Sequence, residues 1–116
     1  MDQHQIIIIG AGMSGLCMAA RLKQQGINDF IVVEKADDLA GTWHYNTYPG
    51  AGCDVPSVFY SYSFFLNPNW SRVYSLHDEI KQYFRDCAQQ LGLYDHIRFG
   101  TEVTRADYQE SDGQWQ

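Results

Sequence analysis

Gly10-Ala11-Gly12-Met13-Ser14-Gly15 directly follows four isoleucines at residues 6–9, near the start of the chain. A short run of β-branched residues predicts a buried strand, and the glycines mark where a helix begins. Gly10 permits the tight turn, Gly12 lets a pyrophosphate approach the backbone, and Gly15 lets the helix pack closely on the strand. The free N–H groups and dipole of that helix, with the hydroxyl of Ser14, would then hold the phosphates. This stretch therefore predicts a nucleotide-binding turn.

The next residues predict the rest of a βαβ unit. Residues 13–25 have helical periodicity, with Leu16, Cys17 and Ala20 toward a sheet, and Gly26 suits the position after the helix end. Residues 30–33, Phe-Ile-Val-Val, predict a second buried strand. Strand, helix and strand within about 30 residues predict an α/β fold of the Rossmann-like kind, with a parallel sheet and crossover helices.

Glu34 ends the second predicted strand, roughly 20 residues beyond the glycine turn, where an acidic residue accepts hydrogen bonds from ribose hydroxyls. Its carboxylate would repel a 2′-phosphate, which disfavours NADP at this turn. The alternative is that Glu34 is a solvated strand end. The glycine spacing and the preceding strand together favour the ribose-binding interpretation.

The second half of the chain contains fewer regular patterns. Residues 42–56 show no sustained period and predict a long ordered loop rich in aromatic residues, while residues 58–64 alternate weakly, as a short strand or an extended lining segment. The sequence Ser75-Leu76-His77-Asp78 fits a capping box. It precedes a helix that ends at Gly92 and whose apolar face comprises Ile80, Tyr83, Phe84, Cys87, Ala88 and Leu91.

The end of the chain predicts further strands. Residues 97–99 and 102–108 are expected to be extended, with a turn at 111–113 and another strand starting at Trp115. A strand cut off there would leave an unpaired sheet edge, which folded domains avoid. We therefore expect a domain that is incomplete at its C-terminus.

Composition excludes several classes of function. The chain has 116 residues, 45% of them hydrophobic, and a formal net charge of −6 without a basic stripe, so we expect no nucleic-acid partner. Cys17, Cys53 and Cys87 are widely spaced, which predicts neither disulfides nor a metal site and fits a cytoplasmic location. The apolar run at residues 6–9 is too short to span a bilayer, and we expect no membrane segment and no signal peptide.

Residues 40–54 read Ala-Gly-Thr-Trp-His-Tyr-Asn-Thr-Tyr-Pro-Gly-Ala-Gly-Cys-Asp. This stretch resembles the long signature of the Baeyer–Villiger monooxygenases, which are class B flavoprotein monooxygenases related to the flavin-containing monooxygenases. The signature asks for a small residue followed by Gly41, then for Trp43, for Tyr-Pro-Gly at 48–50, and for Asp54, and each position is met. The similarity continues through residues 61–64 and, more loosely, through residues 70–93.

The resemblance implies that residues 1–116 are the N-terminal portion of an FAD-binding domain, with the NADPH-binding domain absent from this chain. It implies FAD and NADP(H) as cofactors, and O2 and a ketone or related small molecule as substrates. In this family NADPH reduces FAD, and a C4a-peroxyflavin then inserts one oxygen atom next to the ketone carbonyl. On its own, the 116-residue chain is expected to be inactive.

The resemblance also implies roles for individual residues. Asp54 would be the catalytic residue beside the flavin, positioning an arginine that arrives later in the chain. Thr42 and Trp43 would approach the flavin, and Tyr60 would line the same pocket. One departure is Gly52, where many members of the family carry arginine just before the Cys-Asp pair.

Three other interpretations remain open at this point. The chain could belong to an N- or S-oxygenating flavin-containing monooxygenase, which shares the glycine turn but generally lacks the Trp, Tyr-Pro-Gly and Asp pattern. It could be a truncated nucleotide-binding module that is inactive by itself. The third interpretation is that the chain is half of an NAD-dependent dehydrogenase, and the aromatic loop disfavours it.

Overall fold

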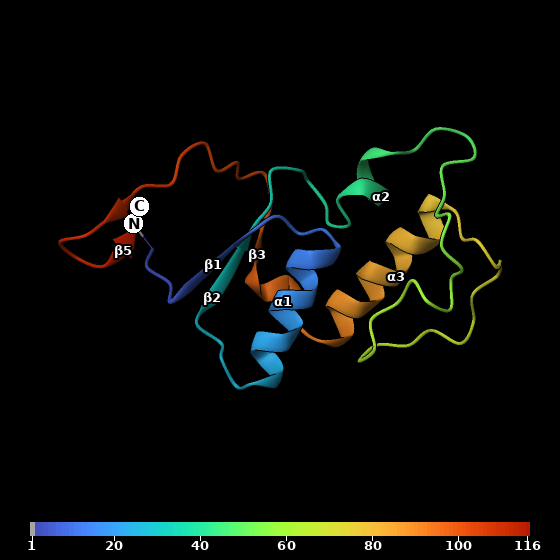
Figure 1. Cartoon of the computed structure of the whole chain (residues 1–116), viewed down its shortest axis with the longest axis horizontal. Coiled ribbons are helices and arrows are strands. Elements are labelled where there is room, and N and C mark those ends of the chain that lie inside the picture. The colour runs from blue at the N-terminus through green and yellow to red at the C-terminus, as the bar shows by residue number, and fades with distance from the viewer. Residues whose placement is uncertain (1) are drawn as a thin grey trace.

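The computed structural model describes residues 2–116 and has a three-stranded parallel sheet at its centre (Figure 1). The strands β1 (Ile6–Ile9), β2 (Phe30–Val33) and β3 (Ile97–Arg98) are paired in that order. Ile6 pairs with Phe30, and Val32 pairs with Ile97. Parallel neighbours require crossover connections, which here contain helices. The predicted α/β fold with a parallel sheet and crossover helices is therefore confirmed.

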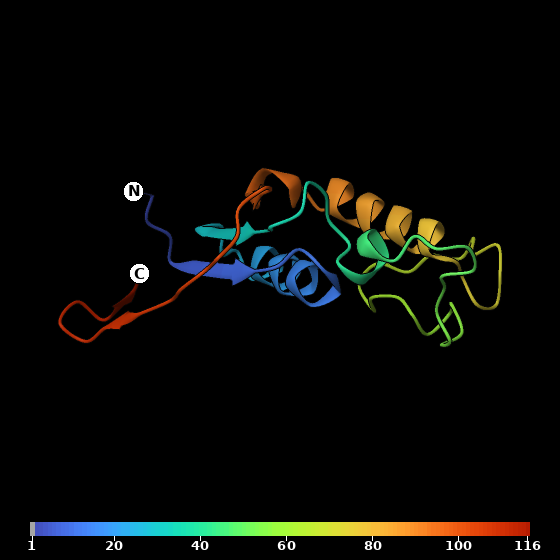
Figure 2. The same ribbon diagram turned by 90° about the horizontal axis from the view of Figure 1, so that it is seen from above.

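The helices lie in the two crossovers. The first contains α1 (Met13–Gln24), and the second contains α2 (Thr42–Tyr45), α3 (His77–Gln90) and the 3₁₀ helix Tyr94–His96. In the view of Figure 2, β2 runs between α1 on one side and α3 on the other. The helix predicted at residues 13–25 is confirmed to within one residue, and Gly26 after it has a φ of +77°. That left-handed conformation is the reason glycine suits the position.

The strand at residues 6–9 is confirmed, but the prediction that it is buried is wrong for one of its faces. Ile7 and Ile9 are 54% and 66% exposed, whereas Ile6 and Ile8 pack against the core. β1 is an edge strand, and side chains that alternate along it point to opposite faces of the sheet. β2 lies between two strands and is buried at all four positions, as predicted.

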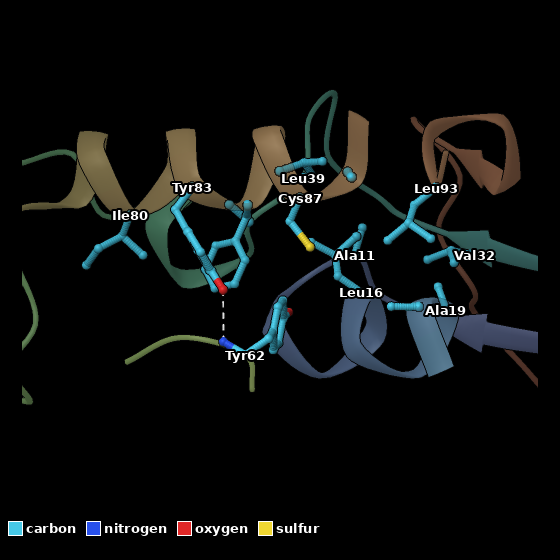
Figure 3. Packing of buried hydrophobic residues seen from close by; sticks show 14 of the residues in the cluster. Ala11, Leu16, Ala19, Val32, Leu39, Tyr62, Ile80, Tyr83, Cys87 and Leu93 are labelled. Atoms are coloured by element: carbon cyan, nitrogen blue, oxygen red, sulfur yellow. Dashed lines mark hydrogen bonds between the residues drawn. The ribbon is translucent and has the colours of Figure 1, made fainter. Parts of the chain in front are cut away.

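The hydrophobic core joins the sheet to α1, α3 and the aromatic loop, which in the structure covers residues 46–76 between α2 and α3 (Figure 3). Tyr83 on α3 is central, because its hydroxyl accepts the backbone N–H of Tyr62 at 2.8 Å and donates to the carbonyl of Phe65 at 2.5 Å. Burial raises the pKa of Tyr83 to about 12. The Tyr62 hydroxyl in turn donates to the carbonyl of Met13 in α1. These bonds tie the aromatic loop to both helices.

The apolar face predicted for α3 is confirmed, but the capping box before it is wrong. Five members of that face are buried, and Leu91 is partly buried. The residue before the helix is Leu76, and no side chain caps the N-terminus. Ser75 is unavailable for capping because its hydroxyl lies 2.5 Å from that of Ser57, and the carboxylate of Asp78 accepts the N–H of Glu79.

Three other predictions of local structure are wrong. The predicted loop at residues 42–56 contains one turn of helix, Thr42–Tyr45. Residues 58–64 form turns with a single antiparallel bridge between Tyr62 and Phe65 instead of a strand. Residues 102–107 are irregular, and β4 (Tyr108–Gln109) pairs with β5 (Gln114–Trp115) in an antiparallel hairpin. The last strand is therefore paired, and its hairpin projects away from the parallel sheet (Figures 1 and 2).

Several features that would suggest other functions are not found in residues 2–116. No helix in this range combines the length and the apolar content needed to cross a membrane. The same residues contain no group of His, Cys, Asp or Glu side chains that could hold a metal ion. Cys17, Cys53 and Cys87 are free thiols, and Cys87 is buried.

Replacing Tyr83 with phenylalanine should destabilise the fold without changing its shape. The variant leaves the N–H of Tyr62 and the carbonyl of Phe65 without this partner, and such losses cost about 1–3 kcal/mol each. Urea denaturation should show a lower midpoint, whereas Tyr94→Phe, on an exposed tyrosine, should leave the midpoint nearly unchanged. Equal midpoints for Tyr83→Phe and the unmodified protein would contradict the role given to this hydroxyl.

Candidate nucleotide-binding site

The glycine turn joins β1 to α1 with a very close backbone contact. Gly10 has a φ of +96°, and its N–H donates to the carbonyl of Val33 at 2.8 Å. A Cβ atom at Gly15 would lie only 1.8 Å from the carbonyl oxygen of Gly10, so no other residue fits there without a backbone shift. The turn thus brings the first residues of α1 against the end of β1, as the glycine spacing predicts.

The N-terminus of α1 is open to an anion. Gly12 precedes the helix, no side chain caps it, and its first turn contains no acidic residue. The first N–H groups of a helix have no partner within the helix, and they carry its positive dipole end. A Cβ atom at Gly12 would meet nothing nearer than the Cα atom of Gly41 at 3.8 Å, so the backbone here can be approached closely. These features suit a phosphate group.

A cavity of about 340 Å³ lies directly over this helix end. Its lining brings together most of the predicted site residues with several others. The lining residues are Ile9, Gly10, Gly12, Met13, Ser14, Gly15, Ala40, Gly41, Thr42, Trp43 and Tyr60. None of these side chains is charged, so an anion here would be bound by backbone N–H groups and hydroxyls.

Glu34 adjoins the cavity and is not a solvated strand end. It is 5% exposed, and its two carboxylate oxygens accept the N–H groups of Ala11 at 2.7 Å and Ala36 at 2.9 Å. A carboxylate has about four acceptor positions, so these bonds leave capacity for further donors. The carboxylate is thus fixed beside the glycine turn. Its role toward a ribose stays a prediction.

The opposite wall of the cavity comes from the loop after β2 and from α2. The indole N–H of Trp43 donates to the hydroxyl of Tyr60 at 3.0 Å, and the two rings meet edge to face. Gly41 has a φ of +52°, and a Cβ atom on it would lie 3.2 Å from the Cα atom of Gly12. The structure therefore places Thr42, Trp43 and Tyr60 with the glycine turn in one cavity.

Asp54 lies apart from these residues. It is exposed and does not line the cavity, so its catalytic role stays a prediction. The neighbouring Cys53 donates its N–H to the carbonyl of Ser75 at 3.0 Å, which anchors this part of the loop beside the start of α3. At Gly52 a Cβ atom would lie 2.9 Å from the same carbonyl, so an arginine would require a shift of the backbone.

Sequence reasoning did not assign four lining residues to the site: Ile9, Met13, Ala40 and Gly41. Ala40 has a φ of +91°, a conformation that L-residues rarely adopt, and its N–H donates to the carbonyl of Ala11 at 3.0 Å. The Ala40-Gly41 pair at the start of the quoted motif was the signal that could have identified two of these four residues. Small residues are required there because the loop backbone runs against the glycine turn.

A model of the NAD(P)-binding Rossmann-like domain matches residues 8–80. The chain belongs to this family. The match includes the glycine turn, Glu34 and the aromatic loop, and it ends within α3.

Individual proteins resemble this Rossmann-like domain over nearly its whole length. A Baeyer–Villiger monooxygenase of Streptomyces coelicolor is 43% identical over 115 residues, which are 99% of this chain and 22% of that protein. A steroid monooxygenase bound to NADP superposes with a TM-score of 0.89 at 38% identity. The protein OTEMO in complex with FAD and NADP gives 0.89 at 32% identity. In both structures the match covers 97% of this chain, and it covers 22% of the steroid monooxygenase and 21% of OTEMO.

The predicted resemblance to Baeyer–Villiger monooxygenases is therefore confirmed. The chain spans about a fifth of the length of the relatives that it matches.

Replacing Glu34 with glutamine should destabilise the Rossmann-like domain. Glutamine offers one acceptor oxygen, so the N–H of either Ala11 or Ala36 would face an amide group that donates. We expect a loss of about 1–3 kcal/mol in the free energy of unfolding, measured by urea denaturation. Glu102→Gln, on an exposed side chain, is the matched control and should change little. If both variants unfold alike, the buried carboxylate does not hold the turn.

Proposed function

We propose that this Rossmann-like domain holds FAD in a Baeyer–Villiger-type monooxygenase that uses NADPH and O2 to insert one oxygen atom next to a ketone carbonyl. One observation carries the proposal. The glycine turn and residues 40–43 of the family signature, Trp43 among them, line the same cavity, in a chain that is 43% identical to a Baeyer–Villiger monooxygenase.

The residues present fit a dinucleotide such as FAD. The open N-terminus of α1 and the hydroxyl of Ser14 would bind the pyrophosphate, and Gly12 would allow its close approach. Glu34 would accept hydrogen bonds from the ribose hydroxyls. Thr42, Trp43 and Tyr60 would contact the flavin. When bound, FAD supplies the redox chemistry that activates O2, which no side chain of the cavity can supply.

Two further parts of the proposal concern groups outside the cavity. Asp54 would act through a cationic partner, because a carboxylate alone would repel negative charge that develops near the flavin. NADPH would bind elsewhere in a longer protein, since the carboxylate of Glu34 disfavours a 2′-phosphate at this turn. The steroid monooxygenase and OTEMO structures, which contain NADP, support the second nucleotide.

Replacing Gly12 with alanine should weaken FAD binding while preserving the fold. Its φ of −81° is accessible to alanine, and the added Cβ atom would meet only ordinary contacts within the protein. The same atom would occupy the space that the pyrophosphate needs. We expect an approximately ten-fold larger dissociation constant for FAD, which corresponds to about 1.4 kcal/mol.

The measurement is a titration of FAD followed by flavin fluorescence, with urea denaturation as the check on folding. Gln24→Ala, at the exposed end of α1 away from the cavity, is the control and should bind like the unmodified protein. Bound FAD should also colour the protein yellow, whereas NAD would leave it colourless. A protein that binds NAD but no FAD would overturn the assignment of the cofactor.

The reaction is tested in a longer protein that carries this Rossmann-like domain. We expect NADPH-dependent conversion of a cyclic ketone to a lactone. Turnover of a tertiary amine or a sulfide without turnover of the ketone would instead support the N- or S-oxygenating alternative. The 116-residue chain, mixed with FAD and NADPH, should not consume NADPH.

A further inference from the structure

The single helical turn α2 forms a wall of the cavity, yet its own sequence cannot hold it in place. It has four residues, no side-chain cap at its N-terminus and no buried residue. Helices this short are unstable in isolation, because few hydrogen bonds offset the cost of ordering the backbone. The position of Trp43 in the cavity must therefore depend on contacts that α2 makes with other elements.

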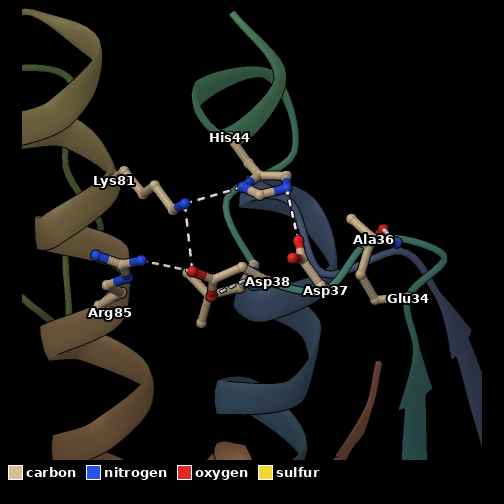
Figure 4. A network of polar contacts seen from close by, with 8 residues as sticks. Glu34, Ala36, Asp37, Asp38, His44, Lys81 and Arg85 are labelled. Atoms are coloured by element: carbon tan, nitrogen blue, oxygen red, sulfur yellow. Dashed lines mark hydrogen bonds and ion pairs between the residues drawn. The ribbon is translucent and has the colours of Figure 1, made fainter. Parts of the chain in front are cut away.

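His44, the next residue, makes such contacts on the side of α2 that faces α3 (Figure 4). Its Nδ1 atom lies 2.8 Å from Nζ of Lys81 on α3, and its Nε2 atom lies 3.2 Å from a carboxylate oxygen of Asp37. The side chains of His44 and Lys81 are only 21% and 18% exposed. The imidazole thus bridges α3 and the loop after β2.

Lys81 takes part in a cluster of ion pairs. Its Nζ atom lies 3.2 Å from a carboxylate oxygen of Asp38, and the same oxygen accepts a hydrogen bond from Arg85 at 2.5 Å. Burial alone would raise the pKa of Asp38, but hydrogen bonds from Arg85, Leu39 and Lys81 lower it below its ordinary value. The Lys81 ammonium group is therefore paired with an ionised Asp38.

An ammonium group can only donate hydrogen bonds. The Nδ1 atom of His44 must then accept, which leaves the imidazole neutral with its proton on Nε2, directed at Asp37. We propose that His44, held in this neutral Nε2–H tautomer between Lys81 and Asp37, is a positioning residue that fixes α2 and thereby the Trp43 wall of the cavity. The bond between Trp43 and Tyr60 is the contact that this arrangement supports on the cavity side.

The proposal is tested first without any cofactor. In the ¹⁵N-labelled protein, a long-range ¹H–¹⁵N spectrum should show the Nδ1 of His44 as unprotonated and Nε2 as protonated, with the signals assigned by their loss in His44→Gln. A protonated Nδ1, in either the other tautomer or the imidazolium, would overturn the proposal.

The second measurement is the solvent exchange of the indole N–H of Trp43. Lys81→Met and His44→Phe each remove the hydrogen bond between residues 44 and 81. Each variant should speed this exchange about ten-fold, because the conformation in which α2 and Trp43 are displaced from the cavity becomes more populated. His44→Gln keeps one acceptor and one donor and should exchange nearly as slowly as the unmodified protein. Arg85→Gln leaves the contact between Lys81 and His44 intact and should also change little.

Equal exchange rates in His44→Phe, Lys81→Met and the unmodified protein would show that His44 does not position the wall. An equal acceleration in Arg85→Gln would assign the effect to the charge cluster as a whole, and would also overturn the proposal.

The consequence for FAD rests on the proposed function. Under it, Lys81→Met and His44→Phe should raise the dissociation constant for FAD several-fold, with His44→Gln restoring the affinity. If the unmodified protein binds no FAD, the proposed function fails, but the spectrum and the exchange rates still decide the role of His44.

Discussion

The carboxylate of Glu34 holds together the three segments on which the site depends. Its two oxygens bind the N–H of Ala11 in the glycine turn and the N–H of Ala36 in the loop after β2. A buried carboxylate is costly unless such bonds stabilise it, so the two segments and the end of β2 are fixed relative to one another. The loop then continues to Ala40, whose N–H binds the carbonyl of Ala11. The cavity exists because these contacts hold the loop against the turn.

The electrostatics of the cavity differ from those of the whole chain. The formal net charge is −6, which would repel an anion at long range. The cavity lining has no charged side chain, and the uncapped end of α1 supplies a local positive field. Under the proposed function, backbone dipoles would bind the phosphates of the nucleotide and the carboxylate of Glu34 would bind its sugar. Such a site would favour free ribose hydroxyls next to Glu34 and disfavour an additional phosphate there.

The aromatic loop and α3 show how a segment with little regular structure can still build a defined wall. The hydroxyl of Tyr83 binds the backbone of Tyr62 and of Phe65 within the loop, and the hydroxyl of Tyr62 binds the start of α1. Lys81, on the same helix, reaches His44 in α2. α3 therefore acts as the scaffold that orders the loop, although none of its residues lines the cavity.

Local sequence patterns were enough to predict several elements of the fold. The strands at residues 6–9 and 30–33, the glycine turn, the place of Glu34 and the buried face of α3 follow from side-chain periodicity and from backbone geometry that only glycine permits. Tertiary structure decided where neighbours compete with local preference. Ser75 does not cap α3 because it is paired with Ser57, and Ile7 is exposed because it points to the face of β1 that does not pack against the core.

Which motif residues share the cavity depends on tertiary packing and could not be predicted from local patterns. Trp43 and Tyr60 are hydrogen-bonded there across 17 positions, whereas Asp54, between them in the sequence, lies outside. His44 and Lys81 are 37 positions apart, and no local pattern indicates their contact. Such pairings depend on how the crossover between β2 and β3 returns over the glycine turn, which is set by packing of the whole domain and not by any single segment.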